Sequence, residues 1–120
     1  MAQTDKPILG LVEVVDIRGN NADTQSLKAR IDTGAQNSSI DLVVAQELRL
    51  GPIIKTKSIR NSHGQSLRPV VKARVVIAGK ELEGEFTIAN RSNMRYKLLV
   101  GQNLLKQGFL IDPSKDDQGK

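Results

Sequence analysis

Cysteine is absent from the 120-residue sequence, which excludes disulfides, thiolate metal sites and cysteine nucleophiles. Histidine occurs once, at His63, so one chain holds neither the residues for a histidine-rich zinc site nor a Ser-His-Asp triad away from that position. Aromatic residues make up 2% of the sequence, which leaves few rings on which nucleic-acid bases could stack. Serine-triad hydrolases, zinc hydrolases and stacking-based nucleic-acid binders are therefore disfavoured.

Long apolar runs are also missing, and none approaches the roughly 20 residues of a membrane-spanning helix. The polar start, Met1 to Lys6, lacks the apolar stretch of a signal peptide, so we expect a cytoplasmic protein that is not bound to a membrane. Lys and Arg number 18 against 13 Asp and Glu, giving a formal net charge of +5. This balance favours acidic partners without identifying one.

Short β-branched segments separated by Gly, Asn and Pro predict a small, mostly β domain over residues 7–114, with disordered tails at 1–6 and 115–120. Asp41 is expected to cap a short helix that Leu50-Gly51-Pro52 ends. Alternating glutamates between residues 81 and 85 predict a solvated strand face opposite a basic strand, rather than an acid pair. We expect strands over 7–17, 26–31, 37–40, 53–60, 66–78, 81–89, 97–100 and 109–111, and short helices over 41–48 and 102–107.

One acidic residue stands where a predicted strand ends. The alternating strand 26–31 delivers Asp32 into the turn Thr33-Gly34-Ala35. Aspartic proteases present their catalytic acid in this way, because glycine lets the backbone approach the carboxylate and the threonine hydroxyl can brace the loop. As a tripeptide the pattern is weak, since Asp-Thr-Gly also occurs as an ordinary turn at the end of a strand.

Two further elements occur in the order expected of a small aspartic protease. The predicted hairpin at Ile59–Val71 has a polar tip, Asn61-Ser62-His63-Gly64, which is typical of a flap that closes over a substrate. Downstream, the apolar strand Leu98-Leu99-Val100 ends in Gly101 and leads into a helical turn, an element that would support the Asp32 loop. His63 itself could contact substrate, but a solvated turn residue is its more ordinary role.

The sequence resembles the ATP-dependent zinc protease family, retropepsin-like proteins associated with the ligase that adds glutamates to a ribosomal protein. The resemblance covers residues 8–114. It rests on KARIDTGA at 28–35, RNSHG at 60–64, RPV at 68–70, NRSNM at 90–94, LVGQNLL at 99–105 and FLIDPS at 109–114.

The resemblance implies an all-β fold: a small closed β-barrel of the retropepsin-like (acid protease) type, with one or two short helices and a flap hairpin. It implies Asp32 as the catalytic residue, with Thr33, Gly34 and Ala35 in the site loop and Leu99, Val100 and Gly101 supporting it. Residues 61–64 (Asn61, Ser62, His63 and Gly64) would contact the substrate. Zinc and ATP belong to the family name, yet the chain has one histidine, no cysteine and no GxxxxGK[ST] loop, so we expect no cofactor and no metal.

Two positions depart from the family pattern. Similar proteins usually carry a basic residue after the site alanine and an arginine after the downstream glycine, whereas this chain has Gln36 and Gln102. In retroviral relatives that arginine pairs with an aspartate just beyond the site loop. Arg91 is the candidate to replace it.

Aspartic proteolysis requires two carboxylates that share one proton, and this sequence supplies one Asp-Thr-Gly. The main hypothesis is therefore a homodimer with Asp32 of each subunit at the two-fold axis and the terminal strands, 8–15 and 109–112, as candidate contacts. Its substrate would be a peptide or protein, with acidic, glutamate-rich peptides favoured if Lys28, Arg30, Arg60 and Arg68 face the cleft. The alternatives are a non-catalytic peptide-binding or dimerisation module of the same fold, a basic barrel that binds RNA, and a monomeric barrel with an ordinary Asp turn.

Overall fold

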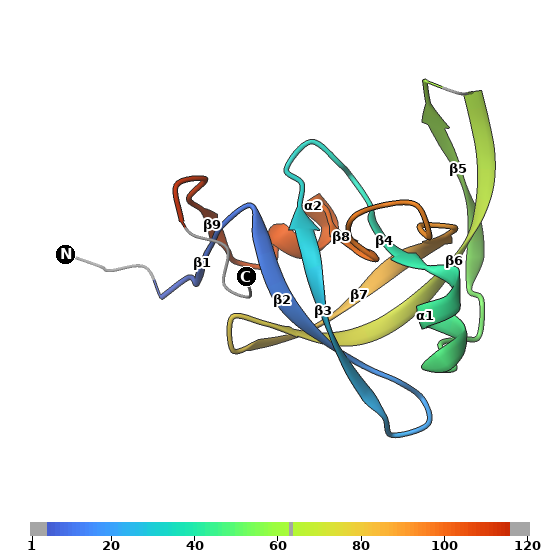
Figure 1. Ribbon diagram of the computed structural model, residues 1–120, viewed down its shortest axis with the longest axis horizontal. Helices are drawn as coiled ribbons and strands as arrows, with labels where there is room; N and C mark the ends of the chain where they lie inside the picture. The colour runs from blue at the N-terminus through green and yellow to red at the C-terminus, as the bar shows by residue number, and fades with distance from the viewer. Residues whose placement is uncertain (1–4, 63, 116–120) are drawn as a thin grey trace.

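The computed structural model describes residues 5–62 and 64–115, and the expectations for residues 1–4, His63 and 116–120 lie outside these ranges. The described residues form strands and two short helices (Figure 1). In chain order these are β1 (Ile8–Leu9), β2 (Val12–Arg18), β3 (Thr24–Ile31), β4 (Ser38–Asp41), α1 (Leu42–Glu47), β5 (Lys55–Asn61), β6 (Gly64–Ile77), β7 (Lys80–Ala89), β8 (Leu98–Val100), α2 (Gln102–Leu105) and β9 (Leu110–Ile111).

The main sheet closes on itself, which confirms the predicted small all-β barrel. Its strand order is β2-β3-β8-β4-β7-β6, and β6 pairs back to β2. The remaining strand, β5, pairs only with β6, so the outer half of the β5–β6 hairpin projects away from the barrel (Figure 1). The hairpin predicted at Ile59–Val71 is therefore present, as the outer part of β5 and β6.

Alternating apolar positions fill the barrel, as the period-2 pattern predicts. Along β6, Val71, Ala73, Val75 and Ile77 are buried, while Lys72 and Arg74 between them are exposed. The fully buried Phe86 and residues such as Val15, Ile40 and Leu98 belong to the same core. Burying each large apolar side chain contributes roughly 1.5–3 kcal/mol, so this cluster is the main source of stability.

The first predicted strand, 7–17, is wrong as a single element, because the chain turns at Gly10. The Gly10 N–H donates to the Glu13 carboxylate at 2.7 Å, and the two halves of the segment take different partners. β1 pairs in parallel with β9, whereas β2 pairs with β3. A glycine followed by an acidic side chain three residues later makes this turn, which hydrophobicity alone did not indicate.

Lys115 is held in place, although we assigned it to a disordered tail. Its Nζ lies 3.0 Å from Glu13 Oε2 and donates to the Ile8 carbonyl at 2.8 Å. Just before it, Asp112 accepts bonds from the N–H and hydroxyl of Ser114, which hold the pKa of this exposed carboxyl below its usual range. These contacts fasten the end of the described chain against its start.

The predicted helix cap is confirmed. Asp41 Oδ2 accepts the Val43 N–H at 3.1 Å, and α1 ends at Glu47, within one residue of the prediction. The second helix is shorter than predicted and ends at Leu105, although the turn continues with a bond from the Gln107 N–H to the Leu104 carbonyl. None of the helices in the described ranges has the length and hydropathy needed to cross a membrane.

The alternating glutamates of β7 face basic side chains, as predicted. Glu81 lies 3.7 Å from both Arg18 and Arg74, and Glu85 lies 3.0 Å from Lys55. These groups are well exposed, so each ion pair contributes little to stability. The glutamates therefore form a solvated, charge-balanced surface rather than an acid pair.

Candidate active site

Asp32 directly follows β3, and its backbone is fixed by the neighbouring strand. β3 and β8 run in parallel with Ile31 opposite Val100, and the Asp32 N–H donates to the Val100 carbonyl at 2.9 Å. The Gly34 N–H donates to Asp32 Oδ1 at 2.9 Å. Asp32 is only partly buried, and its carboxylate is oriented by a backbone donor two residues away.

The turn from β8 into α2 braces this loop from below. The Gln102 N–H donates to the Ala35 carbonyl and its side-chain Nε2 to the Thr33 carbonyl, both at 2.8 Å. A Cβ on Gly101 would collide with the carbonyl oxygens of Ala35 and Asn37, so only glycine permits this close approach. The structure therefore brings Leu99, Val100 and Gly101 beside the Asp32 loop, as the sequence order suggested.

A buried serine joins the two segments. Ser38 Oγ accepts the Gly101 N–H at 3.0 Å and donates to Asn103 Oδ1 at 2.7 Å. Neutral amides and a hydroxyl thus bond the site loop to the turn after β8, where the resemblance predicted an arginine. Arg91 contacts Asp41 through its backbone N–H, which donates to Asp41 Oδ1 at 2.7 Å, while its side-chain Nε donates to the Tyr96 carbonyl at 3.0 Å.

A cavity of about 400 Å³ lies between the site loop and the β5–β6 hairpin. Gly34 to Asn37 form one wall, and Ser39, Thr87 and Leu99 form the floor from three neighbouring strands. From the hairpin, Lys57 to Arg60 and Arg68 line the opposite side, and Arg91 completes the lining. The Lys57 Nζ donates to Asn37 Oδ1 at 2.7 Å, which links the hairpin to the site loop.

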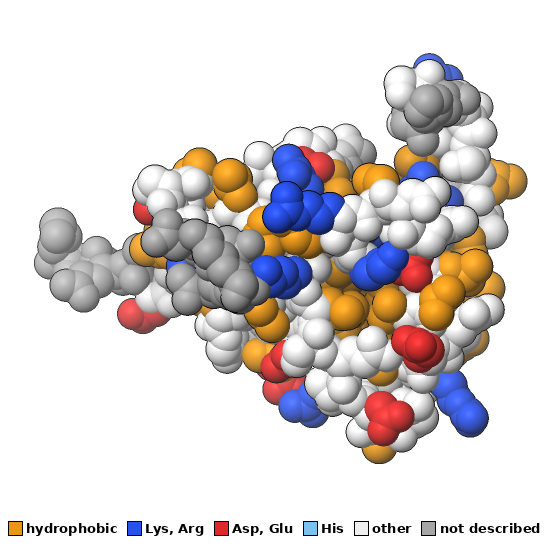
Figure 2. All heavy atoms as spheres, viewed as in Figure 1, with side chains coloured by type: hydrophobic (Ala, Val, Ile, Leu, Met, Phe, Trp, Pro, Cys, Tyr) orange, Lys and Arg blue, Asp and Glu red, His pale blue; other side chains and the backbone are white. Residues whose placement is uncertain are grey.

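The lining of this cavity is basic. It contains Lys57, Arg60, Arg68 and Arg91, and no Asp or Glu lines it among the described residues. Burial lowers the pKa of the Arg91 guanidinium, the charge of Arg68 lowers it further, and Asp41 acts in the opposite direction. Figure 2 shows Lys and Arg side chains gathered on the upper half of the face viewed, whereas Asp and Glu lie mostly in its lower half.

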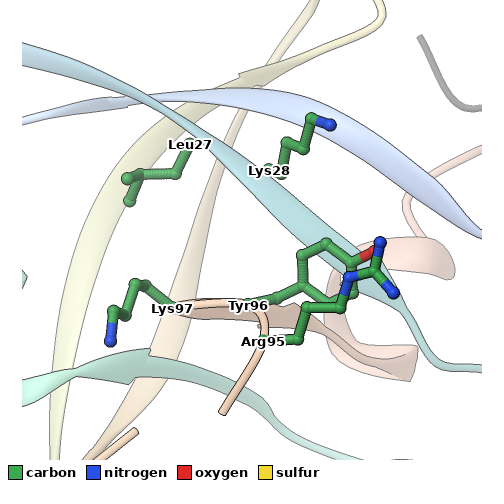
Figure 3. Close-up of a pocket in the computed structure, with 5 residues that line it drawn as sticks. All are labelled: Leu27, Lys28, Arg95, Tyr96 and Lys97. Atoms are coloured by element: carbon green, nitrogen blue, oxygen red, sulfur yellow. The ribbon is translucent and has the colours of Figure 1, made fainter. Parts of the chain in front are cut away.

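A second, smaller basic cavity lies against β3 and the loop before β8. It has a volume of about 220 Å³ and is lined by Leu27, Lys28, Arg95, Tyr96 and Lys97 (Figure 3). The Arg95 guanidinium lies 5.5 Å from the centre of the Tyr96 ring, a cation–π contact. Lys28 therefore lines a different cavity from Arg60 and Arg68, although we had grouped these residues around one cleft.

The hairpin tip lies apart from the site loop within one subunit. Ser62 and Gly64 are exposed, the backbone of Asn61 pairs with that of Gly64 across the hairpin, and neither Ser62 nor Gly64 lines the larger cavity. His63 lies outside the described residues. Sequence reasoning also missed the roles of Lys57 and Ser39, and it assigned Arg91 a different one.

These features define a class: a barrel with an Asp-Thr-Gly loop braced by a glycine turn, beside a projecting hairpin, is a retropepsin-like domain. A family model described as RimB-like, retropepsin-like aspartic endopeptidase RimB, matches residues 44–118, and the chain belongs to this family. The match begins after the site loop. The assignment therefore does not depend on Asp32, and the loop is an independent observation.

The similar proteins are of two kinds. A probable alpha-L-glutamate ligase of Shewanella pealeana is 30% identical over 75% of this chain and 25% of its own length, and one of Desulfotalea psychrophila is 29% identical over 74% and 25%. The chain thus spans about a quarter of the length of these curated relatives.

Two solved structures share the fold. A Legionella pneumophila protein of unknown function has a TM-score of 0.65 at 22% identity, with 95% of this chain and 98% of its own covered. The Simian Foamy Virus protease has a TM-score of 0.57 at 19% identity, with 79% of this chain and 91% of its own covered. At these identities the two structures support the fold alone.

The name of the ATP-dependent zinc protease family, which the sequence resembles, implies zinc. The side chains present do not fit this metal. Residues 5–62 and 64–115 contain no group of three or more His, Cys, Asp or Glu side chains placed to hold a metal.

Proposed function

We propose that the chain is one subunit of a homodimeric aspartic endopeptidase in which the two copies of Asp32 activate water. Two carboxylates about 3 Å apart share one proton, so one accepts a proton from water while the other donates a proton to the peptide carbonyl. The observation that carries the proposal is the Asp32 loop itself, with Gly34 bonded to the carboxylate and Gly101 packed beneath the loop. One chain supplies half of such a site.

Acidic peptides are the proposed substrates. The cavity beside the site loop is lined by four cationic side chains, and a second basic cavity lies along β3. The relatives named as alpha-L-glutamate ligases support the same chemistry, since glutamate gives a peptide a negative charge. A basic cleft attracts such peptides over several ångströms and raises their association rate.

A non-catalytic peptide-binding module of the same fold is the second candidate. The curated relatives that contain a similar segment are named as ligases rather than proteases, which favours a binding role for that segment in those proteins. Such a module would bind acidic peptides without cleaving them. Peptide cleavage that disappears with Asp32 separates the two candidates.

The dimer is tested by measuring mass in solution. We expect sedimentation equilibrium to show twice the 13.1 kDa of one chain at high micromolar concentration. Leu11 is 54% exposed, and its carbonyl accepts the Ile31 N–H, so an apolar side chain lies exposed next to the site strand. Leu11→Asp should weaken the dimer about tenfold or more, because it places a charge in the proposed contact.

Ile53→Asp is the matched control, since Ile53 is 60% exposed and precedes β5, which lies on the opposite side of the molecule from β1 (Figure 1). It should leave the dimer unchanged. A wild-type protein that stays monomeric at high micromolar concentration would contradict the homodimeric site.

Salt tests the acidic substrate. The ratio of kcat/KM for a glutamate-containing peptide to that for its glutamine counterpart should fall about threefold or more between 50 and 500 mM NaCl, because the Debye length contracts to a few ångströms. Peptides of equal length differing only in these residues provide the comparison. Equal rates, or a preference for a lysine-containing peptide, would exclude acidic specificity while leaving the Asp32 chemistry untouched.

A further inference from the structure

Arg91 is an unusual residue in this barrel because its charge is buried and forms no ion pair with any residue in the described ranges. Its side chain is only 8% exposed, and its Nε bond goes to a neutral acceptor, the Tyr96 carbonyl. The charge of Asp41 acts on Arg91, but the two carboxylate oxygens of Asp41 accept the backbone N–H groups of Val43 and Arg91. A buried cation is costly unless a counter-charge accompanies it.

Arg68 adds a second positive charge to the same cavity. It lies on β6 directly opposite Lys57 of β5 and is half-buried. Among the described residues, no ion pair within 4 Å joins the guanidinium group of Arg68 or Arg91 to a carboxylate oxygen. The two guanidinium groups repel each other, which is why Arg68 contributes to lowering the pKa of Arg91.

Ser39 supplies a third feature of the cavity. Its side chain is 6% exposed, it lines the floor, and its hydroxyl is a buried polar group without a hydrogen-bond partner in the structure. Its floor neighbour Thr87, by contrast, donates its hydroxyl to the Ser38 carbonyl at 3.2 Å. Buried hydroxyls are normally satisfied, so an unpartnered one in a cavity indicates a ligand that supplies the partner.

We infer that this cavity is a specificity subsite in which Arg68 and Arg91, with the hydroxyl of Ser39, bind the side-chain carboxylate of a peptide residue next to the cleaved bond. Guanidinium groups match carboxylates in charge and geometry, and a carboxylate has enough lone pairs to accept from all three residues. The subsite adjoins Gly34 to Asn37, so a side chain held here belongs to a peptide whose backbone passes the site loop. This inference rests on the proposed function, because it assigns a substrate side chain to the proposed active site.

The direct test scans one glutamate against glutamine along an octapeptide substrate. At one position near the cleaved bond, wild-type kcat/KM should favour glutamate by about tenfold to a hundredfold, the effect of a charge-assisted hydrogen bond. Arg68→Gln should reduce that ratio about tenfold at that position alone. Arg74→Gln, on the same strand but outside the cavity, removes an equal charge and should leave the ratio unchanged.

Arg91 and Ser39 need separate variants, because Arg91 also holds the loop through the Tyr96 carbonyl. Arg91→Lys keeps the charge but loses the forked geometry, and it should lower the glutamate preference while thermal melting confirms the fold. Ser39→Ala should lower the preference about threefold while thermal stability stays equal or rises, because the variant removes an unpaired buried hydroxyl. A purely structural role for Ser39 would not move the preference.

Binding distinguishes failure of this subsite from failure of the proposed function. In the Asp32→Asn background, fluorescence anisotropy should show fluorescein-labelled hexaglutamate binding more tightly than hexaglutamine. Adding Arg68→Gln should weaken hexaglutamate about tenfold, and adding Arg74→Gln should not.

If wild type cleaves no peptide yet this binding pattern holds, the endopeptidase proposal fails and the subsite stands. Equal losses in the two arginine variants would overturn the subsite, as would glutamate preferences that neither Arg68→Gln nor Arg91→Lys changes.

Discussion

Replacing Asp32 with asparagine is expected to lower kcat/KM for peptide cleavage about a thousandfold while leaving the barrel and the dimer intact. The loss is chemical, because an amide cannot accept the proton of water, and acid–base groups of this kind contribute roughly a hundredfold to ten-thousandfold. The structure explains why the fold survives. Asparagine keeps an oxygen at Oδ1 that can accept the Gly34 N–H, and the backbone bond from residue 32 to the Val100 carbonyl is unchanged.

The measurement is cleavage of a fluorogenic acidic peptide, with circular dichroism and sedimentation on the same samples. Asp5→Asn is the matched control, since Asp5 is exposed and precedes the first strand, and it should cleave at the wild-type rate. Turnover by Asp32→Asn equal to that of the wild type would remove Asp32 from the mechanism and assign the cleavage to other residues.

Local rules predicted much of this barrel because most of its strands carry their own period-2 signal. β6 is the clearest case, since Val71 to Ile77 alternate buried apolar residues with Lys72 and Arg74. The Asp41 cap was also readable, because a short acidic side chain before an apolar run satisfies the first helical N–H groups. The break at Gly10 was not, because it depends on pairing between β1 and the distant β9.

In the candidate site, too, features set by neighbouring residues could be predicted from the sequence, and features set by distant contacts could not. Asp32 and Gly34 are adjacent in sequence, so their turn could be predicted from the residues themselves, and the order of the motifs placed Gly101 near them. The basic cavity depends on three-dimensional packing instead. Arg91 follows β7 in a polar loop, where an arginine is normally exposed, and only the barrel closure buries it beside Arg68 and Ser39. The position of Lys28 was predicted wrongly for the same reason. Strand alternation indicates which face of β3 carries Lys28, but it does not indicate which cavity that face lines.

Gly101→Ala is expected to destabilise the protein by about 3 kcal/mol, near the upper end for overpacking, and to lower the melting temperature by roughly 10–15 °C. The added methyl group would collide with the carbonyl oxygens of Asn37 and Ala35, which are backbone atoms that cannot rotate away. Gly101 has φ −105°, which alanine adopts without strain, so the cost comes from the collision alone. Displacing the site loop by about 1 Å should also reduce cleavage around a hundredfold.

Gly79→Ala is the control that separates collision of an added methyl group from backbone strain as the cause of lost stability. Gly79 has φ +79° and no heavy atom within 4 Å of an added Cβ, so alanine there carries only the left-handed backbone strain, about 1–2 kcal/mol. Thermal unfolding and peptide cleavage should both be measured for the two variants. Gly101→Ala should lose more stability than Gly79→Ala and should be the one that loses cleavage. If the two variants have the same melting temperature and both retain activity, close packing of Gly101 beneath the loop does not hold Asp32 in position.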